Sequence, residues 1–351
     1  MPFGLIWLGF SIVYSLLERG MLGDLDHYPA TGNPYRFSST IIVTAITAVI
    51  SGLLIGSLEA LYLYKLFGQK SLSRKIVYKT VFYLGIIIVF ILINTVIYNS
   101  VELHQSPFSE LIWHKAWMFF SNFAFWGVAV YIASAIGVSL FYNEVSDNLG
   151  QGVLYNFFTG KYHKPVEEER IFMFLDMKSS TTIAEKLGHV RYFEMLREYY
   201  DDLSDPIVRH SGEIYQYVGD EVVVSWTLKK GLQDQNCIQC FFAMKDAIAR
   251  QENKYIDAFG VLPEFKAGFH LGKVTTGEIG AIKKEIIFTG DVLNTTARIQ
   301  GLCNTYGISI LISGPLVMRL PSPTPFGYEA LGESELKGRD EKIKLFTIRA
   351  S

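Results

Sequence analysis

Residues 170–188, RIFMFLDMKSSTTIAEKLG, and residues 212–226, GEIYQYVGDEVVVSW, decide the fold of this chain. The first stretch opens with a largely apolar run, which predicts a short buried strand that ends at Asp176. Small hydroxyl residues then precede a helical pattern, as is typical of a helix N-terminus. In the second stretch Gly219 and Asp220 separate two apolar runs, and this two-residue turn signal predicts the tip of a β-hairpin.

The two aspartates, Asp176 and Asp220, predict a metal and phosphate site where strand ends meet a helix N-terminus. Carboxylates bind hard divalent cations such as Mg²⁺, and free backbone N–H groups at a helix N-terminus receive phosphate oxygens. Two such cations would activate an attacking oxygen and neutralise the leaving one. The alternative is that Asp176 caps a helix and Asp220 is only a turn residue. For a single aspartate that alternative is commoner, but the downstream elements favour a shared site.

The composition leaves room for two domains of different character. The 351 residues are enough for two domains, and the hydrophobic content of 50% is concentrated in the first 145 residues. The formal net charge of −2 argues against a general nucleic-acid-binding surface, so we expect no nucleic-acid partner. The three cysteines, Cys237, Cys240 and Cys303, are too few for a disulfide framework, and the first two lie in a helical pattern that favours packing over zinc or redox chemistry.

Residues 1–145 predict an all-α transmembrane bundle. Long apolar runs of this kind are typical of helices that cross a bilayer. The four predicted spans are residues 2–18, 39–66, 77–98 and 117–142. The first is short for a span and lacks the basic segment that precedes a signal peptide, so we interpret it as a membrane helix.

The distribution of basic residues predicts the orientation of the bundle. The segment between the second and third spans is rich in lysine and arginine: Lys65, Lys70, Arg74, Lys75 and Lys79. The segment between the third and fourth spans holds two glutamates and one lysine. By the positive-inside rule the first segment is cytoplasmic, so both termini lie in the cytoplasm. The sequence therefore predicts a multi-pass cell-membrane protein whose C-terminal domain is cytoplasmic.

Glu59 lies within the second apolar run. It is either a functional intramembrane acid or an acid near the cytoplasmic end that reaches the membrane interface. Lys65 follows six positions later, which favours the interfacial interpretation.

Residues 146–168 predict a connecting segment, and residues 169–351 predict an α+β domain. The connecting segment is too patterned for a loose linker, and a short helix ending near Gly150 or Gly160 would make it a transducer of signals from the membrane. From Arg170 onward, strand and helix periodicities alternate in the order β-α-β-β-α-β. This order is the ferredoxin-like plan.

Two further elements add polar side chains to the predicted site. Asn294 and Arg298 are four residues apart in GDVLNTTARIQG, so on a helix they lie on the same face. An arginine beside an amide suits stabilisation of charge that grows on a phosphorus centre, although a solvated polar face is the alternative. Lys337 lies in the turn of a later hairpin and could reach a triphosphate.

Four motifs in this order, FLDMKSST, YVGDEVV, GDVLNTTAR and LKGR, resemble the catalytic domain of class III nucleotidyl cyclases. The resemblance covers roughly residues 165–350. It implies that Asp176 and Asp220 bind two Mg²⁺ ions, with Mn²⁺ as a substitute, and that the main chain of Met177 takes part. It also implies roles in binding the substrate phosphates or the transition state for Ser180, Thr181, Asn294, Arg298 and Lys337.

The resemblance further implies the reaction and the assembly. In this family the ribose 3′-oxygen attacks the α-phosphate of a nucleoside triphosphate, which closes a 3′,5′-cyclic nucleotide and releases pyrophosphate. Members work as head-to-tail dimers in which one chain supplies the metal-binding aspartates and the other supplies the Asn and Arg. A single copy of the domain therefore implies a homodimer.

Base selectivity is where the chain departs from the family pattern. Gln216 and Ile287 occupy the two positions that usually read the purine, and neither matches the usual adenylyl or guanylyl pair. Gln216 still offers a donor and an acceptor, whereas the Ile287 side chain offers only packing. We expect a membrane-bound adenylate cyclase, because ATP is the commoner substrate of similar bacterial-type domains. The alternatives are a guanylate or dual-specificity cyclase, or a catalytically weak nucleotide-binding signalling module.

Overall fold

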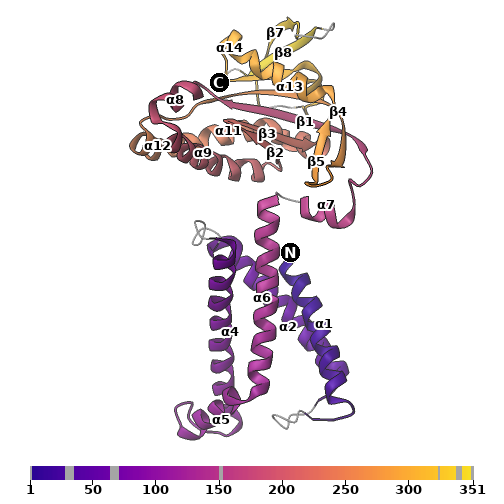
Figure 1. Ribbon diagram of the computed structural model, residues 1–351, viewed down its shortest axis with the longest axis vertical. Helices are drawn as coiled ribbons and strands as arrows, with labels where there is room; N and C mark the ends of the chain where they lie inside the picture. The colour runs from indigo at the N-terminus through magenta and orange to yellow at the C-terminus, as the bar shows by residue number, and fades with distance from the viewer. Residues whose placement is uncertain are drawn as a thin grey trace. The chain divides into compact units, whose positions relative to one another are not determined.

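The computed structural model describes residues 2–27, 35–63, 71–149, 153–322, 325–336 and 342–348 (Figure 1). The chain divides into two compact units, residues 1–149 and residues 150–351. Lys337 and the last residues of the second predicted span, 64–66, lie outside the described residues.

The first unit consists of apolar helices. They are α1 (Pro2–Leu22), α2 (Phe37–Leu58), the π-helical turn η1 (Glu59–Leu63), α4 (Leu72–Glu102), α5 (Glu110–Ser121) and α6 (Phe123–Leu149). α1 packs along α2, and α4 packs along α6 (Figure 1). In the described residues four helices are long and apolar enough to cross a membrane: Pro2–Leu22, Phe37–Tyr62, Leu72–Val101 and Phe123–Ser146.

The observed helices differ from the predicted spans at their ends. The predicted run 117–142 is divided at Asn122, whose backbone is extended and whose side-chain oxygen accepts the N–H of Ala124 at 2.9 Å. A new helix starts at Phe123 and continues to Leu149. Hydropathy identifies only the apolar middle of a helix, whereas the backbone hydrogen bonds of the helix can continue into its polar ends. They stop where a side chain forms a hydrogen bond with a backbone group in place of the helical bond.

Glu59, which the sequence predicts to reach the membrane interface, is buried in an ion-pair network near the end of its helix. Its side chain is 3% exposed and pairs with Lys79 of α4, and the Tyr83 hydroxyl donates a hydrogen bond to it at 2.9 Å. Lys79 also lies 3.2 Å from Glu144 of α6, which lies 3.2 Å from Lys75. Two acids and two lysines therefore join three segments of the bundle, and their mutual pairing makes the burial of these charges possible.

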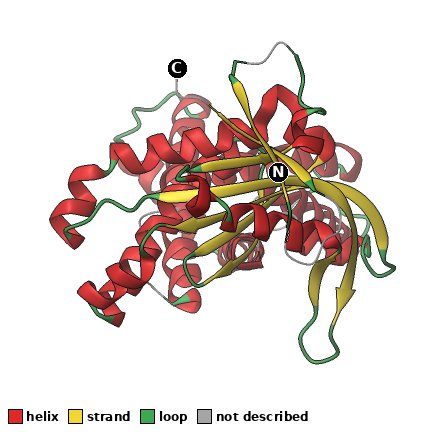
Figure 2. Cartoon of the chain, turned by 90° about the horizontal axis from the view of Figure 1, so that it is seen from above, coloured by secondary structure: helices red, strands yellow, loops and turns green. Residues whose placement is uncertain are grey.

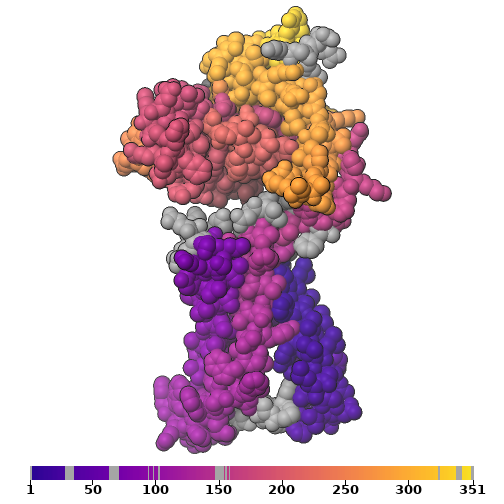
Figure 3. All heavy atoms as spheres, in the orientation of Figure 1, coloured from indigo at the N-terminus to yellow at the C-terminus, as the bar shows by residue number. Residues whose placement is uncertain are grey.

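A cavity of about 210 Å³ lies between α1, α4, α5 and α6. Its lining is largely apolar, with Tyr14 and Glu18 as the polar contributors from α1. The space-filling view shows a gap between α1 and α6 (Figure 3). The packing of α1 against the other helices is therefore incomplete along part of its length.

The second unit is a mixed β-sheet with helices. Its elements are α7 (Val153–Thr159), β1 (Val166–Met177), α8 (Ser180–Leu187), α9 (His189–Arg209), β2 (Glu213–Val218), β3 (Glu221–Thr227), α10 (Leu228–Leu232), η2 (Gln233–Gln235), α11 (Asn236–Arg250), α12 (Glu252–Phe259), β4 (Phe265–Ile279), β5 (Glu285–Thr289), α13 (Asp291–Gly301), α14 (Cys303–Tyr306), β6 (Ile310–Ser313), α15 (Gly314–Val317), β7 (Tyr328–Ser334) and β8 (Ile343–Ile348).

The order of the strands confirms the ferredoxin-like plan. The eight-stranded sheet runs β2-β3-β1-β4-β6-β8-β7, and β5 pairs with β4 outside this path. Figure 2 shows the strands in yellow and the helices in red. The first four strands of this order are antiparallel to their neighbours, as a β-α-β-β-α-β core requires. β4 and β6 are parallel.

β1 is buried on both faces because it lies at the centre of the sheet. Ile171, Met173 and Leu175 belong to the largest core cluster, together with residues of α9 and α11. Phe172 and Phe174 belong to a second cluster with residues of α13 and β5. Since side chains alternate along a strand, an aspartate two residues after Phe174 lies on the face of the sheet that α13 covers.

Two glycines of β4 allow α13 to lie directly on the sheet. A Cβ on Gly268 would lie 2.4 Å from the backbone nitrogen of Gln300, and a Cβ on Gly272 would lie 3.0 Å from Val292. The two glycines are four residues apart on one face of β4, and the two contacted residues belong to α13. The position of α13, which holds Asn294 and Arg298, therefore depends on the absence of side chains at these points.

Candidate active site

The two predicted aspartates converge at one end of the sheet. Asp176 is paired in register with Glu221 of β3, and Asp220 precedes Glu221 in the turn between β2 and β3. Burial raises the pKa of the Asp220 carboxyl, a hydrogen bond with Ser180 lowers it, and the Asp176 carboxyl raises it, with a net upward shift. These interactions bring Asp176, Asp220 and the first residue of α8 together.

One oxygen of this site has no hydrogen-bond partner among the described residues. Oδ2 of Asp220 is buried and has no hydrogen-bond partner in the described part of the chain. A buried carboxylate oxygen without a partner is costly, and a bound cation would remove that cost. The donors that surround it are carboxylate oxygens, which suit Mg²⁺ rather than a thiophilic metal. In the described residues no group of three or more His, Cys, Asp or Glu side chains could hold a metal ion, so the aspartate pair fits a metal that takes its remaining ligands from elsewhere.

Asp176 also has two partners that sequence reasoning did not find. Nζ of Lys266 lies 3.1 Å from its Oδ2, and the side-chain amide of Gln300 donates to the same oxygen at 3.2 Å. Lys266 is a nearly buried residue of β4 and also donates to Asn304 at 3.1 Å. A lysine within the apolar first half of the strand, FKAGF, is the signal that could have indicated its role. Its positive charge offsets part of the negative charge at the site.

Glu221 is a third acid next to the pair. Burial, followed by the negative charges of Asp176 and Asp220, raises the pKa of the Glu221 carboxyl to about 7. Crowded acids at a strand end resist ionisation until a cation arrives. The site as a whole therefore attracts positive charge.

The N-terminus of α8 adjoins the aspartates. Ser179 has a left-handed backbone with a φ of 56°, and α8 begins at Ser180 and Thr181. The first turn of an α-helix leaves backbone N–H groups without intrahelical partners, and they favour anions. Ser180 is joined to Asp220 by a hydrogen bond, so these groups lie beside the aspartate pair.

Asn294 and Arg298 lie on α13 but do not join this cluster. Asn294 is exposed and Arg298 is half-buried. Within the described residues no hydrogen bond or ion pair links either side chain to Asp176 or Asp220, although Gln300 of the same helix contacts Asp176. The structure therefore brings the two aspartates and Ser180 together, and in its described part neither the amide nor the guanidinium bonds to the aspartates.

The two candidate base-reading residues, Gln216 and Ile287, lie on β2 and β5. These two strands contact each other through the residues adjacent to them, Tyr215 and Phe288. Gln216 is exposed on β2, and Ile287 is half-buried on β5. The ring of Tyr215 lies 4.8 Å from that of Phe288, centroid to centroid, and the Phe288 N–H donates to the Tyr215 hydroxyl at 3.3 Å. A β-bulge between Ile214 and Gln216 displaces Tyr215 from the regular register.

Comparison with known proteins identifies the family. The model of the "Adenylate and Guanylate cyclase catalytic domain" family matches residues 162–350, which is more than half of the chain. The protein belongs to this family.

Two curated proteins and a solved structure are similar to this chain. Adenylate cyclase 2 of Rhizobium meliloti (strain 1021) is 38% identical over 223 residues, which are 64% of this chain and 61% of that protein. Adenylate cyclase 1 of the same organism is 30% identical over 187 residues, 52% of this chain and 27% of that protein. The chain therefore spans less than two thirds of the length of either relative. A bacterial light-regulated adenylyl cyclase shares the fold at a TM-score of 0.54 and 18% identity, over 65% of this chain and 66% of its own.

Proposed function

We propose that this protein is a membrane-bound adenylate cyclase that converts ATP into 3′,5′-cyclic AMP and pyrophosphate. The proposal rests on the convergence of Asp176 and Asp220 beside the start of α8, where one buried Asp220 oxygen has no hydrogen-bond partner among the described residues. Membership of the cyclase family and the 38% identity to Adenylate cyclase 2 support the choice of reaction.

Asp176, Asp220 and the main chain of Met177 would hold two Mg²⁺ ions, with Mn²⁺ as a substitute. Bound cations of this kind activate the attacking hydroxyl and neutralise the departing phosphate. The N–H groups at Ser180 and Thr181 would bind triphosphate oxygens, because the first turn of α8 directs free donors toward the aspartates.

A homodimer would complete the site. Asn294 and Arg298 would stabilise the charge that grows on the α-phosphate during attack by the ribose 3′-oxygen. Among the described residues neither side chain bonds to the aspartates of the same chain, which is compatible with a head-to-tail arrangement in which a second copy supplies them. Lys337 of that copy would add a charge to the triphosphate site.

The base would lie between Gln216 and Ile287. The names of the relatives favour ATP, and the two residue types leave a guanylate or dual-specificity cyclase as the alternative. A catalytically weak nucleotide-binding module is less well supported, because such a module has no need for both aspartates together with Asn294 and Arg298.

The first unit would anchor the enzyme in the cell membrane, with lipid as its surroundings and the catalytic unit in the cytoplasm. Four helices of sufficient length and hydropathy support this location, and the basic residues before and within the first turns of α4 support the orientation.

The segment 146–168 would transmit changes in the bundle to the catalytic unit. Within the second unit it is attached to the β4–β5 hairpin: the Glu278 N–H donates to the Tyr162 carbonyl at 3.0 Å, and His163 Nδ1 lies 3.1 Å from the Glu278 carboxylate. Lys284 lies 2.6 Å from the same carboxylate. Because Ile287 lies on β5, a displacement of residues 146–168 would move the strand that holds this candidate base-reading residue.

The test is to incubate the full-length protein with ATP or GTP and Mg²⁺ or Mn²⁺, and to identify the cyclic product. Asp176→Ala and Asp220→Ala should abolish it, whereas Asp205→Ala, at an exposed site on α9, should retain it. Arg298→Ala should lower kcat by about 10²–10³. Product from Asp176→Ala at the wild-type rate would refute the assignment.

Mixing inactive chains tests the shared site. Asp176→Ala and Arg298→Ala chains combined in equal amounts should recover about a quarter of wild-type activity, because about half of randomly formed dimers hold one complete site of two. No recovery, with dimers present, would argue against sites built from two chains.

A further inference from the structure

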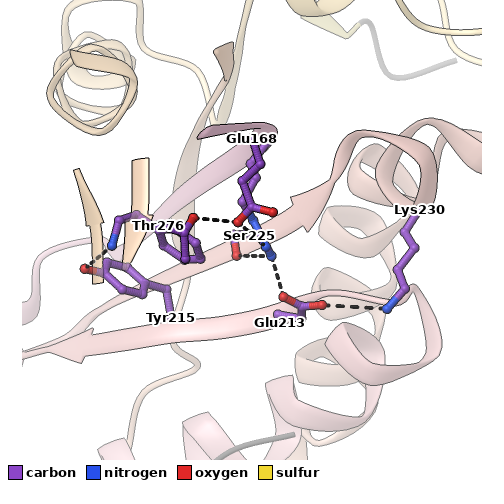
Figure 4. Close-up of polar contacts among 8 residues, drawn as sticks. Glu168, Glu213, Tyr215, Ser225, Lys230 and Thr276 are labelled. Carbon is purple, nitrogen blue, oxygen red and sulfur yellow. Dashed lines mark hydrogen bonds and ion pairs between the residues drawn. The ribbon is translucent and has the colours of Figure 1, made fainter. Parts of the chain in front are cut away.

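Arg170 is a buried charge on β1 that the metal and transition-state chemistry does not use. Its side chain is 2% exposed, and it lies six residues before Asp176 on the same face of the strand. Nη1 lies 3.2 Å from Glu168 Oε1, and Nη2 donates to Ser225 Oγ at 3.1 Å and pairs with Glu213. Figure 4 shows Glu168 and Ser225 on one side of this network and Glu213 on the other.

The guanidinium links the two strands that hold the base-reading positions. Through Glu213 it is joined to β2, three residues before Gln216. Its Cζ lies 4.7 Å from the ring centroid of Phe288, which follows Ile287 on β5. The sheet pairs β2 with β3 and β5 with β4, so side chains must join β2 to β5.

The rest of the network strengthens this link. The Thr276 hydroxyl donates to Glu168 at 2.6 Å, and Lys230 lies 3.6 Å from Glu213 at the outer end (Figure 4). Nε of Arg170 is buried without a hydrogen-bond partner in the described structure, so the arrangement does not satisfy every donor of the guanidinium. Apolar side chains of similar volume often stabilise a core as well as a buried ion pair does. The retained charge therefore requires a reason other than stability.

We propose that Arg170 is a positioning residue for base selection. Arg170 fixes the separation of Gln216 and Ile287 because it forms an ion pair with Glu213 of β2 and stacks on the ring of Phe288 of β5. Because an amide and an aliphatic side chain do not by themselves distinguish adenine from guanine strongly, discrimination depends on how rigidly the two are held. This inference rests on the proposed cyclase function.

The experiment measures kcat and KM for ATP and for GTP with the full-length protein. Arg170→Lys keeps the charge but cannot contact Glu168 and Glu213 in the same forked geometry. We expect it to raise KM for ATP about tenfold and to lower the ATP:GTP ratio of kcat/KM by a similar factor. The Mg²⁺ concentration for half-maximal rate should not change, because Asp176 and Asp220 are untouched.

A second test variant and a control variant accompany Arg170→Lys. Glu213→Gln weakens the ion pair with Arg170 at a half-exposed side chain, where a substitution does not threaten folding. It should lower the ATP:GTP ratio of kcat/KM by a smaller factor than Arg170→Lys does. Arg319→Lys is the matched control: Arg319 lies 3.5 Å from Glu169, next to Arg170 on β1, and among the described residues no hydrogen bond or ion pair joins it to β2 or β5. It should leave both KM values and the ratio unchanged.

The outcomes are distinguishable. If Arg170→Lys and Glu213→Gln lower only kcat, equally for both nucleotides, Arg170 has a structural role alone and the inference is wrong. If Arg170→Lys does not fold, the ratio measured for Glu213→Gln decides by itself. A wild-type protein that makes no cyclic nucleotide would refute the proposed function first, and this inference with it.

Discussion

Replacing Lys266 with methionine removes the ammonium group from Asp176 while keeping most of the side-chain volume. The two charged atoms lie 3.1 Å apart, and the side chains are 11% and 27% exposed. Unit charges at this kind of distance attract by about 4 kcal/mol at an effective dielectric constant of about 20, and breaking a buried pair costs about 3–5 kcal/mol. The partial exposure of Asp176 and its remaining bond from Gln300 reduce the expected loss to about 2–3 kcal/mol.

For a unit of roughly 200 residues this loss corresponds to a fall of about 4–12 °C in Tm. Lys178→Met is the matched control, because Lys178 also lies 3.1 Å from its acid, Glu264, but the side chains are 36% and 71% exposed. An exposed pair contributes about 0–1 kcal/mol, so this variant should lose at most about 4 °C.

The cysteines provide the assay. The three cysteines of the chain are all buried and all belong to the second unit, so a fluorogenic thiol reagent reports the unfolding of that unit without a signal from the bundle. Equal decreases in Tm for Lys266→Met and Lys178→Met would refute the reasoning from burial. Added Mg²⁺ should raise the Tm of Lys266→Met more than that of the wild type, because acids that lack their lysine bind a cation more strongly.

Three further outcomes are expected. The raised pKa of Glu221 means that the folded metal-free protein keeps a proton that the unfolded chain has released, so the free energy of unfolding should fall as pH rises from about 4.5 to about 7. Glu221→Gln should reduce this slope in thermal unfolding, while the raised pKa of Asp220 keeps part of it. Gly268→Ala should cost about 1–3 kcal/mol and reduce cyclase activity by displacing α13, whereas Gly301→Ala on the same helix meets open space and should be neutral or stabilising when Tm is compared. Lys79→Met removes the ammonium group that pairs with the buried Glu59 carboxylate and should reduce the yield of monodisperse protein in detergent, and the exchange variant Glu59→Lys/Lys79→Glu should recover part of it.

Local patterns account for the parts of the fold that the sequence predicts well. Strand and helix periodicity placed β1, the β2–β3 hairpin and α13 close to their observed positions, because each depends on neighbours within a few residues. The same patterns placed Asp176 at a strand end and Asp220 at a hairpin tip. Their proximity followed from the family resemblance and from the antiparallel pairing of β1 with β3.

The differences between prediction and structure have a common physical origin. The burial and pairing of Glu59 were not predicted because its partners, Lys79 and Tyr83, are 20 and 24 residues away in the chain, beyond the reach of any local pattern. The fourth apolar run was divided because Asn122 accepts a backbone N–H, a detail that hydropathy does not measure.

By itself, the sequence determined the apolar runs, the order of strands and helices, and the identity of the acids, amide and guanidinium of the candidate site, because these depend on composition and spacing. The tertiary structure alone decided that Lys266 and Gln300 contact Asp176, that one Asp220 oxygen has no hydrogen-bond partner among the described residues, and that Arg170 is buried between β2 and β5. These contacts form where strands that are distant in the chain pair and a helix packs on them. Burial there makes an unpaired charge costly, so the buried charged groups are paired.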